Sequence, residues 1–103
     1  MCTALTYKTK DFYFGRNLDY EHGYGQSIIV VPKNYPIPFR HMKDLDHHYA
    51  LIGMGIMTAG YPNHFEAMNE KGLAMAGLNF VGNAVYHPVD ASNDNVAQFE
   101  LVN

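Results

Sequence analysis

The side chain best suited to nucleophilic chemistry is the second residue of the chain, Cys2. If Met1 is removed, which the small size of the cysteine side chain favours, Cys2 carries a thiol and a free α-amine on one residue. An α-amine has an ordinary pKa of about 7.7–8.0, so near neutral pH it can accept the thiol proton and generate a thiolate. The alternative is an incidental small residue at the start of a strand, and position alone favours that alternative.

Two charged residues close an apolar segment in the run Gly15-Arg16-Asn17-Leu18-Asp19. An arginine near a thiol stabilises the thiolate, and an aspartate near an α-ammonium can orient that group. In a regular strand Arg16 and Asp19 would point to opposite faces, so both can serve one site only if the strand ends or bulges near Asn17. A surface salt bridge worth about 0–1 kcal/mol is an equal alternative.

Asn79 is a third candidate, because a side-chain amide at the end of a strand can donate to a developing oxyanion and contribute several kcal/mol. An asparagine in a turn before Gly82 is the more common situation. The six histidines show no spacing typical of a metal site: His47 and His48 are adjacent, and His41 lies six residues before His47. We therefore expect solvated loop histidines and no metal.

These candidates must be positioned by strands, because the sequence consists of short apolar runs broken by turn residues. The run 27–31 is β-branched and apolar on both faces, which predicts a strand covered on both sides. A Gly-ending turn at 70–72 predicts a hairpin, with a helix over 64–71 as the competing interpretation. The other expected elements are strands at 2–7, from 12, and at 49–54, a polar hairpin turn at 8–11, hairpin arms at 65–69 and 73–80, loops at 32–46 and 82–95, and a helix from about 96.

Length and composition restrict the class of protein. The 103 residues, 48% hydrophobic and 17% charged, predict one domain at most and exclude a disordered tail. The net charge of -3 with 7 Lys and Arg argues against nucleic-acid binding and against a basic membrane-surface helix. No apolar run approaches the roughly 18 residues that span a membrane, and no secretory signal is recognisable, so a cytoplasmic location is expected.

Several separated motifs, in register along the whole chain, resemble those of the choloylglycine hydrolases, the family of bile salt hydrolases and penicillin V acylases. The resemblance is nearest to the bile salt hydrolases of gut lactobacilli and enterococci. The motifs are Met-Cys-Thr at the start, Phe-Gly-Arg-Asn-Leu-Asp at 14–19, Asn-Tyr at 34–35, Asn-Glu-Lys-Gly-Leu at 69–73 and Ala-Gly-Leu-Asn-Phe at 76–80.

The resemblance implies a role for each candidate. Cys2 corresponds to the nucleophile exposed by Met1 removal, and Arg16 to the arginine beside the thiol. Asp19 corresponds to the aspartate that contacts the nucleophile's amino group, and Asn79 to an oxyanion-site asparagine. An apolar pocket for a steroid acyl group is also implied. Candidate lining residues, which ordinary core packing would equally explain, are Leu18, Tyr24, Met57, Tyr61 and Phe65.

The implied fold is α+β, an N-terminal nucleophile αββα sandwich, of which residues 1–103 form the β-rich N-terminal part of a single domain. Family members are longer and commonly homotetrameric, and they use no cofactor or metal. The implied reaction is hydrolysis of the amide bond between a bile acid and glycine or taurine. Hydrolysis of penicillin V or another acyl amide, and a non-enzymatic β-rich module, are the alternatives.

Overall fold

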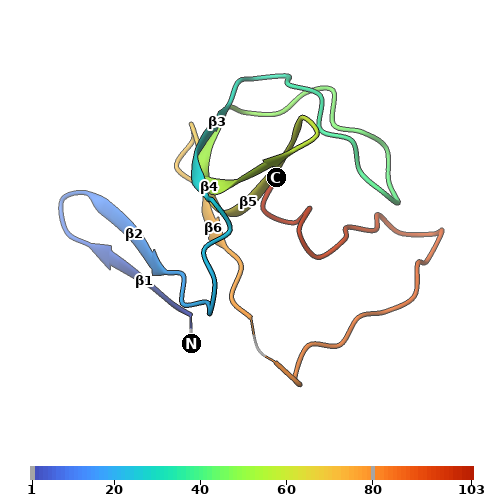
Figure 1. Cartoon of the computed structure of the whole chain (residues 1–103). Coiled ribbons are helices and arrows are strands. Elements are labelled where there is room, and N and C mark those ends of the chain that lie inside the picture. Colours follow the sequence, from blue (N-terminus) through green and yellow to red (C-terminus); the bar gives the residue numbers. More distant parts are fainter. Residues whose placement is uncertain (1, 80) are drawn as a thin grey trace.

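The computed structural model describes residues 2–79 and 81–103, and its strands form two antiparallel sheets (Figure 1). The first sheet is the hairpin β1–β2 and the second has the order β3-β4-β5-β6. The described residues contain no helix, so the chain is β-rich. The strands are β1 (Thr3–Lys8), β2 (Phe12–Asn17), β3 (Ser27–Val31), β4 (Leu51–Thr58), β5 (Tyr61–Asn69) and β6 (Ala74–Ala76).

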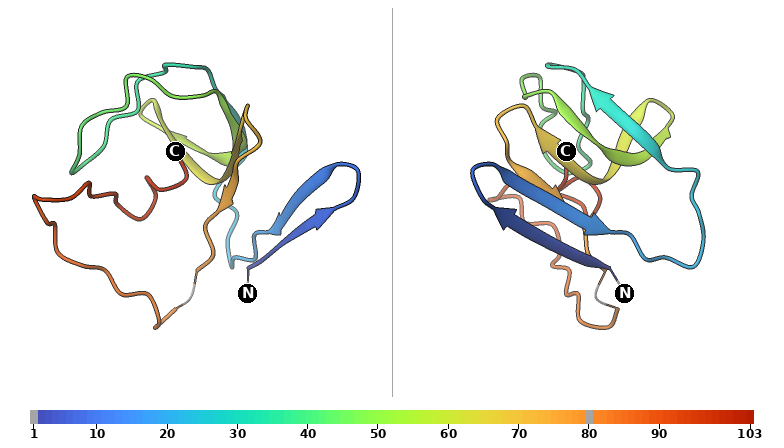
Figure 2. Two further views of the ribbon diagram at one scale, coloured as in Figure 1. Left: turned by 180° about the vertical axis from the view of Figure 1, so that it is seen from behind. Right: turned by 90° about the vertical axis from the view of Figure 1, so that its left-hand side faces the viewer.

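The hairpin β1–β2 confirms the expected first two strands and the polar turn between them. Its register pairs Thr3 with Asn17 and Ala4 with Arg16. The strand β2 ends at Asn17, as the sequence required if Arg16 and Asp19 are to serve one site. The hairpin lies on one side of the larger sheet, while the loop before β4 and the C-terminal segment lie on the other side (Figure 2).

The larger sheet has a hairpin that the sequence did not indicate. The strand expected at 49–54 runs instead from Leu51 to Thr58 and turns at Ala59 and Gly60, which have φ values of 50° and 83°. The hydroxyl of Tyr35 donates to the Gly60 carbonyl oxygen at 2.6 Å and ties the loop to this turn. The expected turn at 70–72 is confirmed, with Gly72 at a φ of 86°. The helix considered for 64–71 does not form, because residues 64–69 belong to β5, which pairs with β4 and β6, and residues 70–71 lie in the turn that follows.

The hydrophobic core lies on the inner face of this sheet. Ile29, Val31 and Leu51 are buried there against Ile37, which comes from the loop between β3 and β4. On the opposite, outer face Ile28 is 68% exposed and Val30 is 65% exposed. The expectation of a strand covered on both faces is therefore wrong for the described residues, since only the inner face of β3 has a covering layer.

The C-terminal part of the chain differs from the expected pattern. The strand β6 covers three residues, shorter than the arm predicted at 73–80, and Phe80 lies outside the described residues. No helix forms from position 96; residues 98–102 make turns only. In the described part of the chain, no helix has the length and apolarity needed to cross a membrane.

Candidate functional site

Cys2 and Asp19 meet at the base of the first hairpin. The half-buried Cys2 thiol donates to the backbone carbonyl oxygen of Asp19, with a sulfur-to-oxygen distance of 3.7 Å. Cys2 directly precedes β1, and continuing the alternation of that strand by one residue places Cys2 on the same face as Ala4 and as Arg16, the cross-strand partner of Ala4. The hairpin thus brings three of the four predicted catalytic residues together. Removal of Met1 stays a prediction, because Met1 lies outside the described residues.

Arg16 is held by the larger sheet. Its side chain is only 3% exposed, Nη1 lies 3.2 Å from Oε2 of Glu66 on β5, and Nη2 donates to the carbonyl oxygen of Gly77 just after β6. The surface salt bridge considered from the sequence is therefore wrong for Arg16, which is buried and reaches another sheet. A guanidinium this buried requires a negative partner, because an unpaired buried charge is strongly destabilising.

Asn79 follows Gly77 by two residues and is exposed. Because Gly77 accepts a hydrogen bond from Arg16, the chain carries Asn79 past the end of β6 close to the residues that Arg16 contacts. Its oxyanion role stays a prediction.

Two of the five predicted pocket residues contact each other beside this hairpin. The rings of Tyr24 and Phe65 pack edge to face, with centroids 6.0 Å apart and planes at 65°. Tyr20, which sequence reasoning missed, packs on Tyr24 with centroids 5.2 Å apart. Leu18 is half-buried and directly precedes Asp19. Aromatic and aliphatic side chains in this arrangement can form one wall of an apolar pocket.

The other two pocket candidates lie elsewhere. Tyr61 packs against the core and lines an open hollow of about 570 Å³, together with residues 38–40 and 97–100. Burial raises the pKa of Tyr61, and its hydroxyl accepts a hydrogen bond from the side-chain amide of Asn103 at 3.0 Å. Met57 is 51% exposed near the end of β4, on the inner face of the sheet. Neither residue joins the group around Phe65.

Glu66 is the functional candidate that sequence reasoning missed. Burial raises the pKa of its carboxyl group, while the charges of Arg16 and His64 act in the opposite direction. Glu66 stands in an otherwise apolar segment, Phe65-Glu66-Ala67-Met68, which is the one sequence signal that it faces a charged partner.

The histidines are only partly as expected. His64 is 1% exposed, and its Nδ1 lies 2.8 Å from the side-chain oxygen of Asn103, so the expectation of a solvated histidine is wrong there. Its burial depends on a residue 39 positions away, which local sequence does not indicate. Among residues 2–79 and 81–103, no group of three or more His, Cys, Asp or Glu could hold a metal ion.

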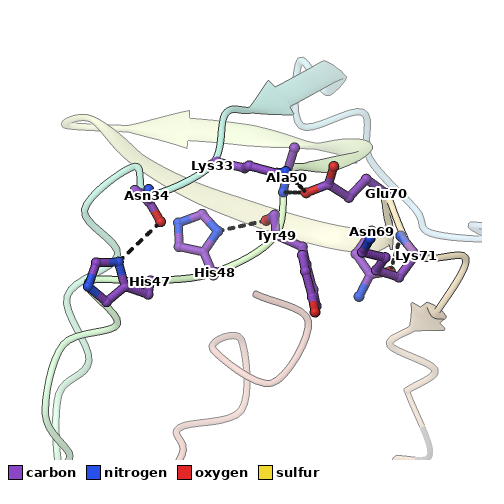
Figure 3. Close-up of polar contacts among 9 residues, drawn as sticks. All are labelled: Lys33, Asn34, His47, His48, Tyr49, Ala50, Asn69, Glu70 and Lys71. Carbon is purple, nitrogen blue, oxygen red and sulfur yellow. Dashed lines mark hydrogen bonds and ion pairs between the residues drawn. The ribbon is translucent and has the colours of Figure 1, made fainter.

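A second polar cluster lies around the start of β4 (Figure 3). The Lys33 ammonium lies 3.1 Å from a carboxylate oxygen of Glu70, which also accepts from the Ala50 backbone N–H at 3.3 Å. The ring of His48 lies between two backbone carbonyl oxygens, those of Tyr35 and Tyr49, at 2.7 Å each. The contacts of Glu70 fasten the loop between β3 and β4 to the β5–β6 turn, and those of His48 join two parts of that loop, so the cluster has a structural role.

Comparison with known proteins identifies the family. Residues 2–103 match the model of the linear amide C–N hydrolases of the choloylglycine hydrolase family. The chain is 50% identical to a bile salt hydrolase/transferase of Lactiplantibacillus plantarum, with 99% of the chain and 32% of that protein aligned. It is 42% identical to a conjugated bile acid hydrolase of Lactobacillus gasseri, with 99% of the chain and 33% of that protein aligned.

A solved structure supports the same assignment. A crystal structure of a mutant conjugated bile acid hydrolase from Clostridium perfringens superposes with a TM-score of 0.86 at 39% identity, covering 99% of this chain and 32% of that one. The chain thus spans about a third of the length of the relatives it matches. The aligned region starts with Cys2 and includes Arg16, Asp19, Glu66 and Asn79. The chain belongs to the choloylglycine hydrolase family of linear amide C–N hydrolases.

Proposed function

We propose that the chain is the N-terminal part of an enzyme that hydrolyses the amide bond of conjugated bile salts, with Cys2 as the nucleophile. The observation that carries this proposal is the meeting of the Cys2 thiol and Asp19 on the hairpin face that also presents Arg16. The family match and the printed activities of the relatives, bile salt hydrolase and conjugated bile acid hydrolase, support the same reaction.

In the proposed mechanism, the α-amine released by removal of Met1 takes the Cys2 thiol proton. The thiolate attacks the amide carbonyl carbon and forms a tetrahedral oxyanion, to which the Asn79 side-chain amide donates. The protonated α-amine gives its proton to the leaving nitrogen of glycine or taurine as the C–N bond breaks. Water then attacks the resulting thioester, and the bile acid leaves with regeneration of the thiol.

Arg16 and Asp19 have supporting roles in this scheme. The guanidinium of Arg16 stabilises negative charge on the Cys2 side of the hairpin, because it is buried and its field is weakly screened. Asp19 orients the α-ammonium group. The group formed by Leu18, Tyr24 and Phe65 supplies an apolar wall for the acyl part of the substrate.

We also propose the architecture of the longer protein. The two sheets described here fit the β layers of an αββα sandwich, and residues 1–103 would form the N-terminal part of that single domain. The exposed outer face of β3, with Ile28 and Val30, is the kind of surface that a further layer buries. A homotetramer and a cytoplasmic location complete the proposal for the longer protein.

Separate incubations with taurocholate, glycocholate and penicillin V test the substrate class. We expect release of taurine or glycine from the bile salts and little turnover of penicillin V. Hydrolysis of penicillin V alone would assign the second candidate activity, and turnover of none of them by a protein that retains Met1 would favour the non-enzymatic alternative.

A further inference from the structure

The contact between Arg16 and Glu66 joins the nucleophile hairpin to the larger sheet. The Glu66 side chain is 17% exposed and the Arg16 side chain 3% exposed, so water screens the pair weakly. The Nη2 group of Arg16 donates to Gly77, whereas Nε and Nη1 of Arg16 and Oε2 of Glu66 are buried without a hydrogen-bond partner among the described residues, so the contact between Arg16 and Glu66 is ionic. The orientation of the guanidinium therefore depends on two oxygen groups, one from Glu66 and one from Gly77.

A β-bulge in β5 aims Glu66 at Arg16. Gly55 on β4 pairs with His64, while the preceding residue Met54 pairs with Glu66, so Phe65 is the extra residue. Pro62 and His64 point to the inner face and are buried. Without the bulge, strict alternation would send Glu66 to that inner face as well.

The bulge also brings the second oxygen into place. The Gly77 N–H donates to the carbonyl oxygen of the bulged residue Phe65 at 2.9 Å, and Glu66 pairs with Ala76. The Glu66 carboxylate and the Gly77 carbonyl therefore stand next to each other at the edge of the larger sheet. Bulges are frequent beside active sites, where they redirect a side chain.

The charges of Arg16 and Glu66 depend on each other. The charged groups that act on Glu66 are Arg16 from β2 and His64 from its own strand. Removing Glu66 would leave a buried guanidinium with one neutral acceptor, and removing Arg16 would leave a largely buried carboxylate without its positive partner. The two residues therefore act as a unit.

We propose that Glu66 is the positioning residue of Arg16, and that it holds the guanidinium on the hairpin face shared with Cys2 and balances part of its charge. The inference rests on the proposed role of Cys2 as nucleophile. It adds to that role a carboxylate on a different sheet, so that the electrostatic environment of the nucleophile depends on how the larger sheet docks against the hairpin.

The test uses the protein at its natural length and measures the rate of Cys2 alkylation by iodoacetamide as a function of pH. We expect Glu66→Gln, which keeps shape and an acceptor oxygen but removes the charge, to alkylate about threefold faster at pH 6.5, because the positive charge of Arg16 is then no longer partly balanced. The matched control is Glu70→Gln, which removes the same charge from the Lys33 ion pair at the β5–β6 turn and should leave the rate unchanged.

A double-variant comparison separates action through Arg16 from direct action. In an Arg16→Leu background, Glu66→Gln should have no further effect, because the guanidinium through which Glu66 acts is then absent. A rate for Glu66→Gln equal to that of Glu70→Gln, or an effect of the same size in the Arg16→Leu background, would overturn the proposal. Alkylation requires no bile-salt turnover, so failure of the proposed substrate class and failure of this inference remain distinguishable.

The positioning role has its own measurement. Modification by phenylglyoxal, read from peptide masses, should increase at Arg16 relative to the exposed Arg40 in Glu66→Asp, whose carboxylate falls one methylene short. Glu70→Asp should leave that ratio as in the unmodified sequence. Glu66→Asp retains the negative charge, so it can still test the proposal if Glu66→Gln fails to fold. An unchanged Arg16 to Arg40 ratio in Glu66→Asp would contradict the positioning role.

Discussion

Replacement of Gly53 by alanine should prevent β4 and β5 from pairing as they do. A Cβ at Gly53 would overlap the Glu66 carbonyl oxygen and lie 2.7 Å from the Ala67 Cα. These atoms are backbone, so no side-chain rotation relieves the overlap, and the strands must separate. The displaced residue is Glu66 itself, so the substitution also disturbs the partner of Arg16.

The expected loss in the free energy of unfolding has two contributions, both from forcing β4 and β5 apart. Overpacking in a fixed environment costs about 1–3 kcal/mol, and loss of one ladder hydrogen bond adds roughly 1 kcal/mol. We therefore expect a loss of about 3 kcal/mol in the free energy of unfolding. With a urea dependence of roughly 1.5 kcal/mol per M, the midpoint of unfolding should fall by about 2 M.

The assay is urea unfolding followed by tyrosine fluorescence, since the chain has 8 tyrosines and no tryptophan. Gly15→Ala is the matched control, because Gly15 is also in a strand but an added Cβ there meets nothing within 4 Å. That variant should be neutral or more stable by about 0.5 kcal/mol, because alanine has less conformational freedom in the unfolded chain. Equal midpoints for the two variants would refute the close approach of β4 and β5.

Three further predictions concern the site and the second polar cluster. Cys2→Ser should abolish most bile-salt turnover, because a serine hydroxyl forms the anion far less readily than a thiol; near-normal turnover numbers would remove Cys2 from the mechanism. Phe65→Ala should raise the KM for taurocholate, whereas Met57→Ala should not, because Phe65 packs on Tyr24 and Met57 lies elsewhere; equal KM values for the two would contradict the proposed wall. The hydrogen bond from Lys33 lowers the pKa of Glu70, so its contribution to stability is present above the ordinary glutamate pKa and is lost as pH falls below it. Glu70→Gln should therefore lessen the loss of stability between about pH 5 and pH 3 in thermal unfolding, and an identical pH dependence in both proteins would count against the ion pair.

The strands and the nucleophile hairpin were predictable because their signals are local. The β-branched run at β3 gave its bounds, Ser27–Val31, and the polar turn after Lys8 gave the first hairpin. The condition that the strand end near Asn17 came from side-chain alternation alone, and β2 ends there.

The features that were missed depend on side-chain contacts that a propensity pattern does not show. The helix expected near position 96 fails because the side-chain amide of Asn95, just before it, bonds the carbonyl oxygen and the N–H of Asp90 at 2.8 and 2.9 Å. Glu100 turns back to the Ala97 N–H and to the Arg40 N–H, 60 residues away in the chain.

The bulge at Phe65 was also missed, and with it the role of Glu66. No residue type in 61–69 marks the extra position, because a bulge is set by pairing with the neighbouring strands. Tyr61 and Met57 were grouped with Phe65 from their residue types, which do not fix position in the fold, and both lie apart from Phe65.

The central claim is that Cys2, freed of Met1, forms a covalent acyl intermediate. Brief reaction with taurocholate, acid quenching and mass spectrometry of the N-terminal peptide test it directly. We predict a peptide that begins with Cys2 and carries a cholyl group in thioester linkage, which disappears on longer incubation. A peptide that retains Met1, or turnover of taurocholate with no acyl group on Cys2, would contradict the account.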